Sequence, residues 1–147
     1  MILFVSVAIK SLVELGRRYE WPKDLVCPEC GSRLWGHGFV QAWFDGCPQA
    51  VRLARYRCSQ CRKVFRARPV GYWSRFQASI SDIRESLSHR LSHLRWPSGR
   101  SPSRQRHWLS GLKKQILARW GAGWAGNFLE AFDQLCREGI PAVSRSI

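Results

Sequence analysis

Two hydrophobic periods divide the chain near residue 79. Before that point, short apolar runs alternate with polar residues, as at 51–56, and turn residues separate the runs. After it, apolar residues recur every three or four positions, as in Ile80, Ile83 and Leu87. A period of two is typical of strands, and a period of 3.6 is typical of amphipathic helices. The pattern therefore predicts an α+β protein in which a small sheet is followed by a helical unit.

The first part is predicted to hold an N-terminal strand, a short helix and a three-stranded antiparallel sheet. Residues 2–9 are apolar and β-rich, and the helix follows to about Arg18, with Ser11 and Glu14 matching a capping box. We expect this helix to cover the edge of the sheet. The three strands are expected at 34–44, 51–58 and 64–66, because turn residues such as Asp45 and Gly46 separate them.

The second part predicts helices at 79–95, 101–120 and 125–137. Ser79 is a candidate N-cap, residues 96–99 interrupt the pattern, and Pro102 suits the first turn of the second helix. Glycine and proline within 139–141 end the third helix. The apolar residues expected to face inward are Ile80, Ile83, Leu87, Leu91 and Leu94, then Trp108, Leu109, Leu112, Ile116, Leu117 and Trp120, then Phe128, Leu129, Phe132, Leu135 and Cys136.

These elements define five segments. The N-terminal strand and helix occupy 1–24, the sheet 25–68, a linker 69–78, the helical unit 79–139 and a loose tail 140–147. The linker contains Tyr72, Trp73 and Phe76, which either stack on nucleic-acid bases or pack the sheet against the next part of the chain. We favour packing for these three residues.

Two C-x-x-C pairs, Cys27 with Cys30 and Cys58 with Cys61, stand 27 residues apart. Four thiolates at about 2.3 Å complete a tetrahedral Zn²⁺ shell that has no open position for chemistry. The spacing therefore predicts a four-cysteine zinc ribbon with one structural zinc ion. Alternatives are a pair of disulfides or a redox C-x-x-C, but a redox pair begins a helix in a βαβ unit, and no such pattern surrounds either pair.

Three further side chains are either ligands or ordinary structural residues. His37 lies within the first expected strand, and Cys47 lies near the turn that follows it. With four cysteines already available, we interpret His37 as a strand residue and Cys47 as a turn or core thiol. Cys136 lies on the apolar face of the third helix and is interpreted as core.

The charge distribution predicts a polyanionic partner. The net charge is +14, from 24 basic and 10 acidic residues, and 19 of the basic residues are arginine. Residues 46–81 contain eight bases and no acid. An arginine-rich proteome encoded by a high-GC genome would explain arginine over lysine, but not the missing acids, so we favour nucleic acid as the partner. The contact residues expected in the sheet are Arg52, Arg55, Arg57, Arg62 and Lys63.

The first two helices are compatible with a helix-turn-helix that reads duplex DNA. In that motif the first turns of the second helix contact base edges in the major groove. The residues expected to read bases are Arg104, Gln105 and Arg106, and Lys113 and Lys114 are expected to hold phosphates. The alternative is an ordinary three-helix bundle with a solvated basic face.

Catalysis and membrane insertion are not expected. No closely spaced set of acids resembles a two-metal nuclease site, and no glycine-rich phosphate loop follows a strand. No stretch reaches the roughly 18 apolar residues that span a bilayer. The apolar start lacks a basic n-region and soon meets Lys10, so we expect no signal peptide and a cytoplasmic location.

Three motifs together carry a family resemblance. They are C-P-x-C-G-S at residues 27–32, the His37-Gly38 pair, and Y-R-C-x-x-C-x-x-x-F at 56–65. They resemble the zinc ribbon at the front of many bacterial insertion-sequence transposases, and residues 103–109 are similar to the end of the recognition helices in that family. The resemblance covers about 25–120 and implies a zinc ribbon and a helix-turn-helix that bind transposon DNA. The catalytic domain that follows these parts in the family has no counterpart in this sequence.

The sequence thus predicts a zinc-dependent, non-catalytic DNA-binding protein, derived from or associated with a transposon. Two alternatives remain open. One is RNA binding, in which ribbon aromatics stack on unpaired bases. The other is a protein adaptor that docks on a separate transposase or another nucleic-acid enzyme.

Overall fold

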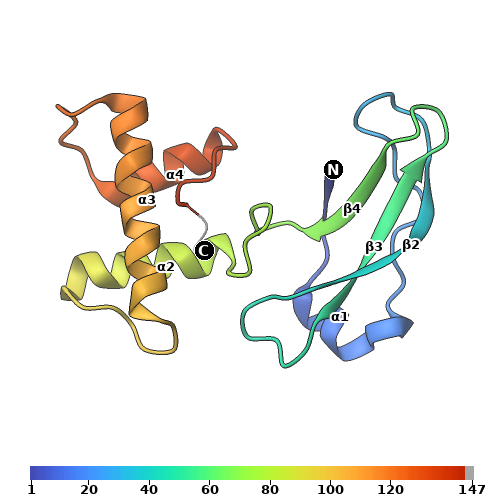
Figure 1. Cartoon of the computed structure of the whole chain (residues 1–147), viewed down its shortest axis with the longest axis horizontal. Helices are drawn as coiled ribbons and strands as arrows, with labels where there is room; N and C mark the ends of the chain where they lie inside the picture. The colour runs from blue at the N-terminus through green and yellow to red at the C-terminus, as the bar shows by residue number, and fades with distance from the viewer. Residues whose placement is uncertain (145–147) are drawn as a thin grey trace. The chain divides into compact units, whose positions relative to one another are not determined.

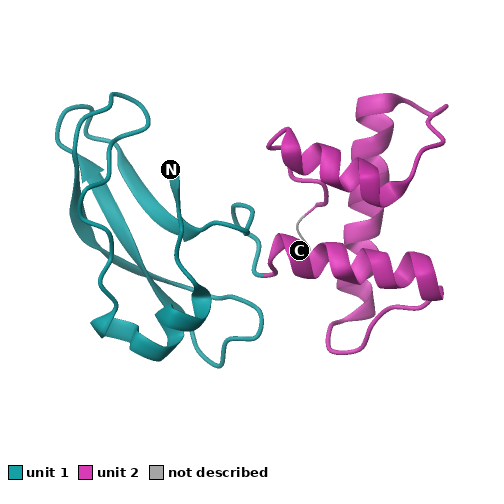
Figure 2. Ribbon diagram, turned by 180° about the vertical axis from the view of Figure 1, so that it is seen from behind, with its two compact units in different colours: residues 1–77 teal, residues 78–147 magenta. Residues whose placement is uncertain are grey.

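The computed structural model describes residues 1–144, which form two compact units, one of residues 1–77 and one that begins at Ala78 (Figure 2). The described residues hold a four-stranded sheet and four α-helices, so the fold is α+β, as predicted (Figure 1). None of these helices is long and apolar enough to cross a membrane.

The sheet of the first unit has the order β1-β4-β3-β2, with strands Ile2–Val5 (β1), Leu34–Ala42 (β2), Val51–Cys58 (β3) and Val64–Pro69 (β4). Neighbouring pairs β2–β3 and β3–β4 are antiparallel, whereas β1 runs parallel to β4. The N-terminal strand is therefore part of the same sheet, which is mixed rather than purely antiparallel. It also ends at Val5, short of the predicted residue 9.

Helix α1 (Ile9–Leu15) and a 3₁₀ turn (Gly16–Arg18) follow β1. The predicted capping box is wrong, because the N-cap is Ala8 and no side chain caps the helix. The prediction that this helix covers the sheet edge is also wrong. Its buried Leu12 packs with residues of β3, the central neighbour of β2 and β4, and so covers a face.

Strand β3 supplies two hydrophobic clusters on opposite faces of the sheet. Leu53 belongs to the cluster with Leu12 of α1, while Ala54 and Tyr56 belong to the cluster that contains the metal-binding end. Successive side chains of a strand point to opposite faces, so the two clusters lie on opposite sides. The sheet is covered on one face at one end and on the other face at the other end.

The segment after β4 packs onto the first unit. Arg68 is buried, and its guanidinium donates to the carbonyl oxygens of Trp73 (3.0 Å) and Phe76. The Tyr72 ring meets the Phe44 ring edge-on at 4.9 Å. Burial lowers the pKa of Arg68, but its bonds to these carbonyls keep the segment folded back. The linker aromatics therefore pack, and they pack on the sheet unit itself.

The helical unit contains α2 (Ile80–His93), α3 (Pro102–Trp120) and α4 (Phe128–Arg137). Each begins at a side-chain cap: the hydroxyls of Ser79 and Ser101 accept from backbone N–H groups, and the Asn127 carbonyl oxygen accepts two. The predicted Ser79 cap is confirmed. The third helix starts later than the predicted residue 125, because Asn127 provides its cap.

The core of this unit comprises Ile83, Leu87, Trp108, Leu112, Ile116, Phe132 and Leu135. Four residues predicted to face inward are instead exposed: Leu91, Leu94, Leu117 and Trp120. They lie in the last turns of α2 and α3 or just beyond. Figure 1 shows α3 crossing α2 steeply, so the helix ends extend past their partners.

The chain after α4 returns to α3. Ala142 and Val143 are buried, and the Gln115 amide donates to the Pro141 carbonyl at 3.1 Å. A Cβ on Gly111 would stand 2.3 Å from the Ser144 nitrogen, so the chain passes directly over this glycine. The predicted loose tail is wrong for 140–144, and its remainder, 145–147, lies outside the described residues.

Candidate metal centre

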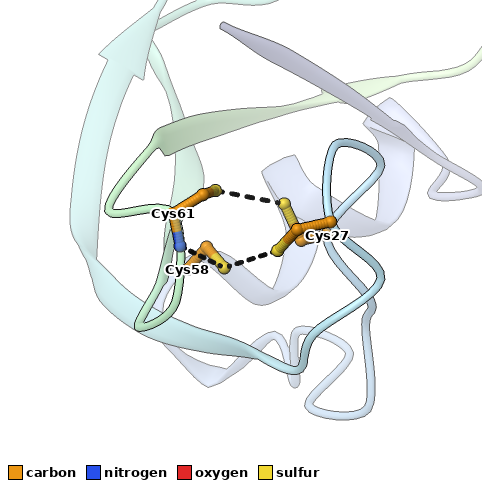
Figure 3. A group of neighbouring side chains, drawn as sticks. Cys27, Cys58 and Cys61 are labelled. Atoms are coloured by element: carbon orange, nitrogen blue, oxygen red, sulfur yellow. Dashed lines mark hydrogen bonds between the residues drawn. The ribbon is translucent and has the colours of Figure 1, made fainter.

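Each C-x-x-C pair is held in a turn by its own backbone. In the first, the Gly31 N–H donates to the Cys27 carbonyl at 2.8 Å. In the second, the Cys61 N–H donates to the Cys58 sulfur at 3.5 Å. The residue after each second cysteine has a positive φ, 74° at Gly31 and 65° at Arg62. The two turns therefore share one backbone form and direct their thiols toward each other (Figure 3).

The four sulfur atoms have the spacing of a tetrahedral metal site. Cys27 Sγ lies 3.7 Å from Cys61 Sγ, and Cys30 Sγ lies 3.4 Å from Cys58 Sγ. All four lie within 4.8 Å of one another. A tetrahedron with metal–sulfur bonds of 2.3 Å has edges of about 3.8 Å. The site therefore fits one metal ion held by four thiolates.

The geometry also excludes the two alternatives, a pair of disulfides and a redox C-x-x-C. A disulfide bond is about 2.0 Å long, and all six cysteines are free. A redox C-x-x-C begins a helix, but here each pair lies in a turn beside a strand. The geometry of the site is that of ligands rather than of an oxidised pair.

The ligands are also part of the hydrophobic core. Cys27 and Cys58 are buried in the cluster with Phe65, while Cys30 is exposed. A Lys63–Glu29 ion pair of 2.7 Å joins the two turns outside the sulfurs. Because Cys27 and Cys58 pack with apolar side chains, loss of a bound metal would leave two unpaired ligands in the core.

The clustered thiols differ in acidity. Hydrogen bonds from the side chain and backbone of Ser32, with a smaller contribution from Cys58, lower the pKa of Cys30 to about 6. At Cys61 the backbone N–H of Lys63 favours the thiolate, but burial and the neighbouring thiols outweigh it and raise the pKa to about 11. A bound cation replaces these protons, so metal affinity falls as the pH falls.

The remaining candidate ligands lie outside this group. Among residues 1–144 the histidine, cysteine and acidic side chains that could hold a metal are these four cysteines. Cys47 packs against the cluster that contains Phe44. Burial, first among its causes, raises the pKa of Cys136 on α4, as expected of a thiol on an apolar face.

The predicted contact residues of the sheet have different surroundings. Arg57 and Arg62 are exposed and line a hollow of about 380 Å³ with Trp35, His37 and Ser59. In contrast, the Arg52 guanidinium lies over the Phe39 ring at 3.4 Å, Arg55 is half-buried, and Lys63 is ion-paired to Glu29. The structure therefore brings two of the five residues together in one open surface.

Sequence reasoning missed Trp35, which is 53% exposed beside that hollow. The strand register sets Trp35 opposite Arg57. Cross-strand partners project from the same face of a sheet. Pairing the aromatic strand with the Y-R-C motif would therefore have placed Trp35 beside Arg57.

On α3, the predicted contact residues are split between the surface and the core. Arg106, Lys113 and Lys114 are exposed, and the Arg104 guanidinium lies 5.0 Å from the Trp108 ring. Gln105 is fully buried, so its predicted role as a base reader is wrong for this conformation.

The burial of Gln105 has a clear structural reason. Its amide donates to the carbonyls of Pro97 (3.3 Å) and Arg100 (3.1 Å) and accepts from the Ser86 hydroxyl. Position 105 also precedes Trp108 by three residues, which places both on the inward face of the helix.

The connection between α2 and α3 is longer than a helix-turn-helix requires. Residues 94–101, eight in number, separate His93 from Pro102, whereas that motif uses a turn of about three to four residues. Gln105 binds two carbonyls of this connection and so fixes its course.

Comparisons with protein-family models, curated proteins and solved structures found no match for this chain. The resemblance to transposase ribbons therefore rests on the motifs alone.

Proposed function

We propose that the protein is a zinc-stabilised, non-catalytic nucleic-acid-binding protein whose sheet unit contacts the phosphate backbone of DNA. The observation that supports this most is the open hollow beside the second cysteine turn. It is lined by Arg57 and Arg62, and its lining residues include no acid. Arginine guanidinium groups bind phosphates through paired N–H donors.

Zinc is the proposed metal. Four thiolates suit Zn²⁺, and they leave no coordination position for a substrate. The ion would hold the two turns together and so position Arg62, which directly follows Cys61. It therefore supplies structure, while the chemistry of recognition belongs to the basic side chains.

The exposed cations of α3 are proposed to add phosphate contacts. Arg106, Lys113 and Lys114 are all exposed on this helix. With Gln105 buried, base reading by α3 is reduced to Arg104 and Arg106. We therefore expect binding that depends strongly on charge and weakly on sequence.

The test is the salt dependence of binding to a duplex, with Arg57 and Arg62 both changed to alanine. Losing two phosphate contacts is expected to weaken binding and to reduce the slope of log affinity against log salt by about two. The matched control changes Arg17 and Arg18 to alanine, because both are exposed and lie on the 3₁₀ turn.

If the two double variants weaken binding equally, the hollow contributes only through the net charge of the protein. An affinity that ignores salt would contradict nucleic-acid binding and favour a protein adaptor. Purified protein is expected to contain one zinc ion per chain, measured by elemental analysis, and a Cys47→Ser control is expected to retain it.

A second candidate is binding of single-stranded nucleic acid, RNA included. The exposed indole of Trp35 beside two arginines favours it, because unpaired bases stack on such rings. Tighter binding to a single strand than to a duplex of the same sequence would support this candidate.

A further inference from the structure

A second, larger cavity lies between the segment 19–23 and strands β2 and β3. It encloses about 520 Å³, which is within the range of sites that bind small organic ligands. Its lining is mainly apolar and includes five aromatic residues: Tyr19, Trp21, Trp35, Phe39 and Tyr56. The Tyr56 hydroxyl donates to the Pro22 carbonyl at 2.8 Å and so anchors the segment to β3.

Two buried donors among the lining residues have no acceptor. They are the indole Nε1 of Trp21 and the guanidinium Nε of Arg55, and neither has a hydrogen-bond partner within residues 1–144. Both atoms carry a hydrogen and cannot accept one. Both atoms are fully buried beneath the lining, so the surface that the cavity offers to a ligand is its aromatic one.

The cavity borders a bulge in β2. The pairing of β2 with β3 shifts by one residue between Gly36 and Phe39, and Gly38 adopts a φ of 80°. A Cβ on Gly36 would meet no atom within 4 Å, so this position opens onto free space. At Gly38, the nearest atom to such a Cβ would be Arg55 Nη2 at 3.5 Å. Gly36 thus leaves open space beside the bulge, and the Arg55 guanidinium lies close to the backbone at Gly38.

The cavity adjoins the phosphate-binding hollow proposed above. Trp35 and Gly36 line both. The larger cavity is also lined by Lys23, Arg33 and Arg55 against one acid, Glu20. A ligand with a planar apolar part and an adjoining anion would therefore match the two hollows together.

We propose that this cavity receives a single unpaired nucleobase, while the adjoining phosphate lies at Arg57 and Arg62. This rests on the proposed function and specifies the part of the nucleic acid that is recognised. The base would stack among the aromatic side chains that line the cavity.

The probe is a DNA duplex with one unpaired thymine, compared with the same duplex carrying an abasic nucleotide at that position. Stacking of one base on aromatic side chains gives a preference on the order of tenfold for the thymine duplex. Titration of the full-length, metal-loaded protein, followed by fluorescence anisotropy of a labelled duplex, measures the preference.

Two variants separate the cavity from the rest of the protein. Trp35→Ala removes an exposed ring from the lining, so it is expected to keep the melting temperature and lose most of the preference. Gly36→Val extends a side chain into the open space and is expected to abolish the preference. Gln41→Val is the matched control, because Gln41 is an exposed residue of the same strand.

The outcomes distinguish this inference from the proposed function. A thymine preference that Trp35→Ala and Gly36→Val remove, and Gln41→Val keeps, supports the base site. Equal, salt-dependent binding of both duplexes overturns the base site and leaves the proposed function standing. Binding of neither duplex overturns both. A preference that survives in Trp35→Ala and Gly36→Val also overturns the site.

Discussion

The sheet unit and the helical unit differ in how their surface arginines are used. In the helical unit, Arg84 makes two bonds to Asp133, and Arg119 meets Glu138 at 3.0 Å. In the sheet unit, Arg57 and Arg62 make no ion pair with any residue of 1–144 and line an open hollow. At these positions the same residue type joins two helices in one unit and leaves a free surface charge in the other.

The units also close their cores differently. Cys27 and Cys58 are core residues of the sheet unit, so its packing includes its metal ligands. The helical unit is closed by apolar side chains around one buried amide, that of Gln105. A unit that depends on a metal should respond to chelation as a whole, whereas a unit that depends on side-chain packing should respond to single substitutions.

Metal removal is expected to produce the largest difference in stability between the two units. Binding to four thiolates contributes on the order of 10–16 kcal/mol, which exceeds the stability of most small domains. Chelation, or Cys58→Ser, is therefore expected to unfold residues 1–77 while the helical unit stays folded. Hydrogen exchange read peptide by peptide measures both units in one experiment.

Cys47→Ser and Cys136→Ser are the controls, because neither residue belongs to the ligand group. They should retain metal and protection. Full protection of residues 1–77 in protein shown to be metal-free would contradict a structural role for the metal.

A smaller effect is expected from Gln105→Ala in the helical unit. The change leaves the Ser86 hydroxyl and two carbonyls of the connecting loop without partners, at a cost of about 2–3 kcal/mol. Urea denaturation followed by far-UV circular dichroism checks this. Arg106→Ala, the exposed neighbour, should change stability by less than about 0.5 kcal/mol.

Unchanged stability of Gln105→Ala together with lost sequence discrimination would contradict the buried role. That result would restore the interpretation of Gln105 as a base reader.

The smallest expected effect is the loss of stability of the helical unit at low pH. The Arg84 guanidinium lowers the pKa of Asp133, so the pair stabilises the fold above the ordinary aspartate pKa of about 4. That stability is lost as the pH falls through the lowered folded value. Both side chains are partly exposed, which limits the effect to about 1 kcal/mol.

Asp133→Asn should remove this part of the acid sensitivity of the helical unit. Melting temperatures between about pH 5 and pH 2 measure it. An unchanged pH dependence in Asp133→Asn would show that the pair contributes nothing to stability.

The cysteine site was predictable because its information is local. Two C-x-x-C spacings and one glycine after a knuckle determine both turns, and strand β3 at 51–58 follows from its alternation. The helix cap at Ser79 is equally local. The parallel pairing of β1 with β4 joins residues more than 60 positions apart, as in Ile2 with Arg66, and no short pattern specifies it.

Predicting which basic residues are exposed requires the phase of each helix and the register of each strand, and composition gives neither. Counting arginines could not separate buried Arg68 from exposed Arg57. The three-residue step from Gln105 to Trp108 indicates that both lie on one face of α3, whereas the helix-turn-helix motif predicts Gln105 on the outer face. The cavity behind Trp35 borders the one-residue shift in β2, which appears only when β2 and β3 are paired.

Gly111 shows how a local rule can change sign. By helix propensity alone, glycine inside α3 is about 1 kcal/mol worse than alanine, so a stabilisation scheme would replace it. The returning chain at Ser144 leaves no room for a methyl group, and the adjacent Val143 gains about 1.5–3 kcal/mol from burial. At this one position, the better helix former makes the poorer protein.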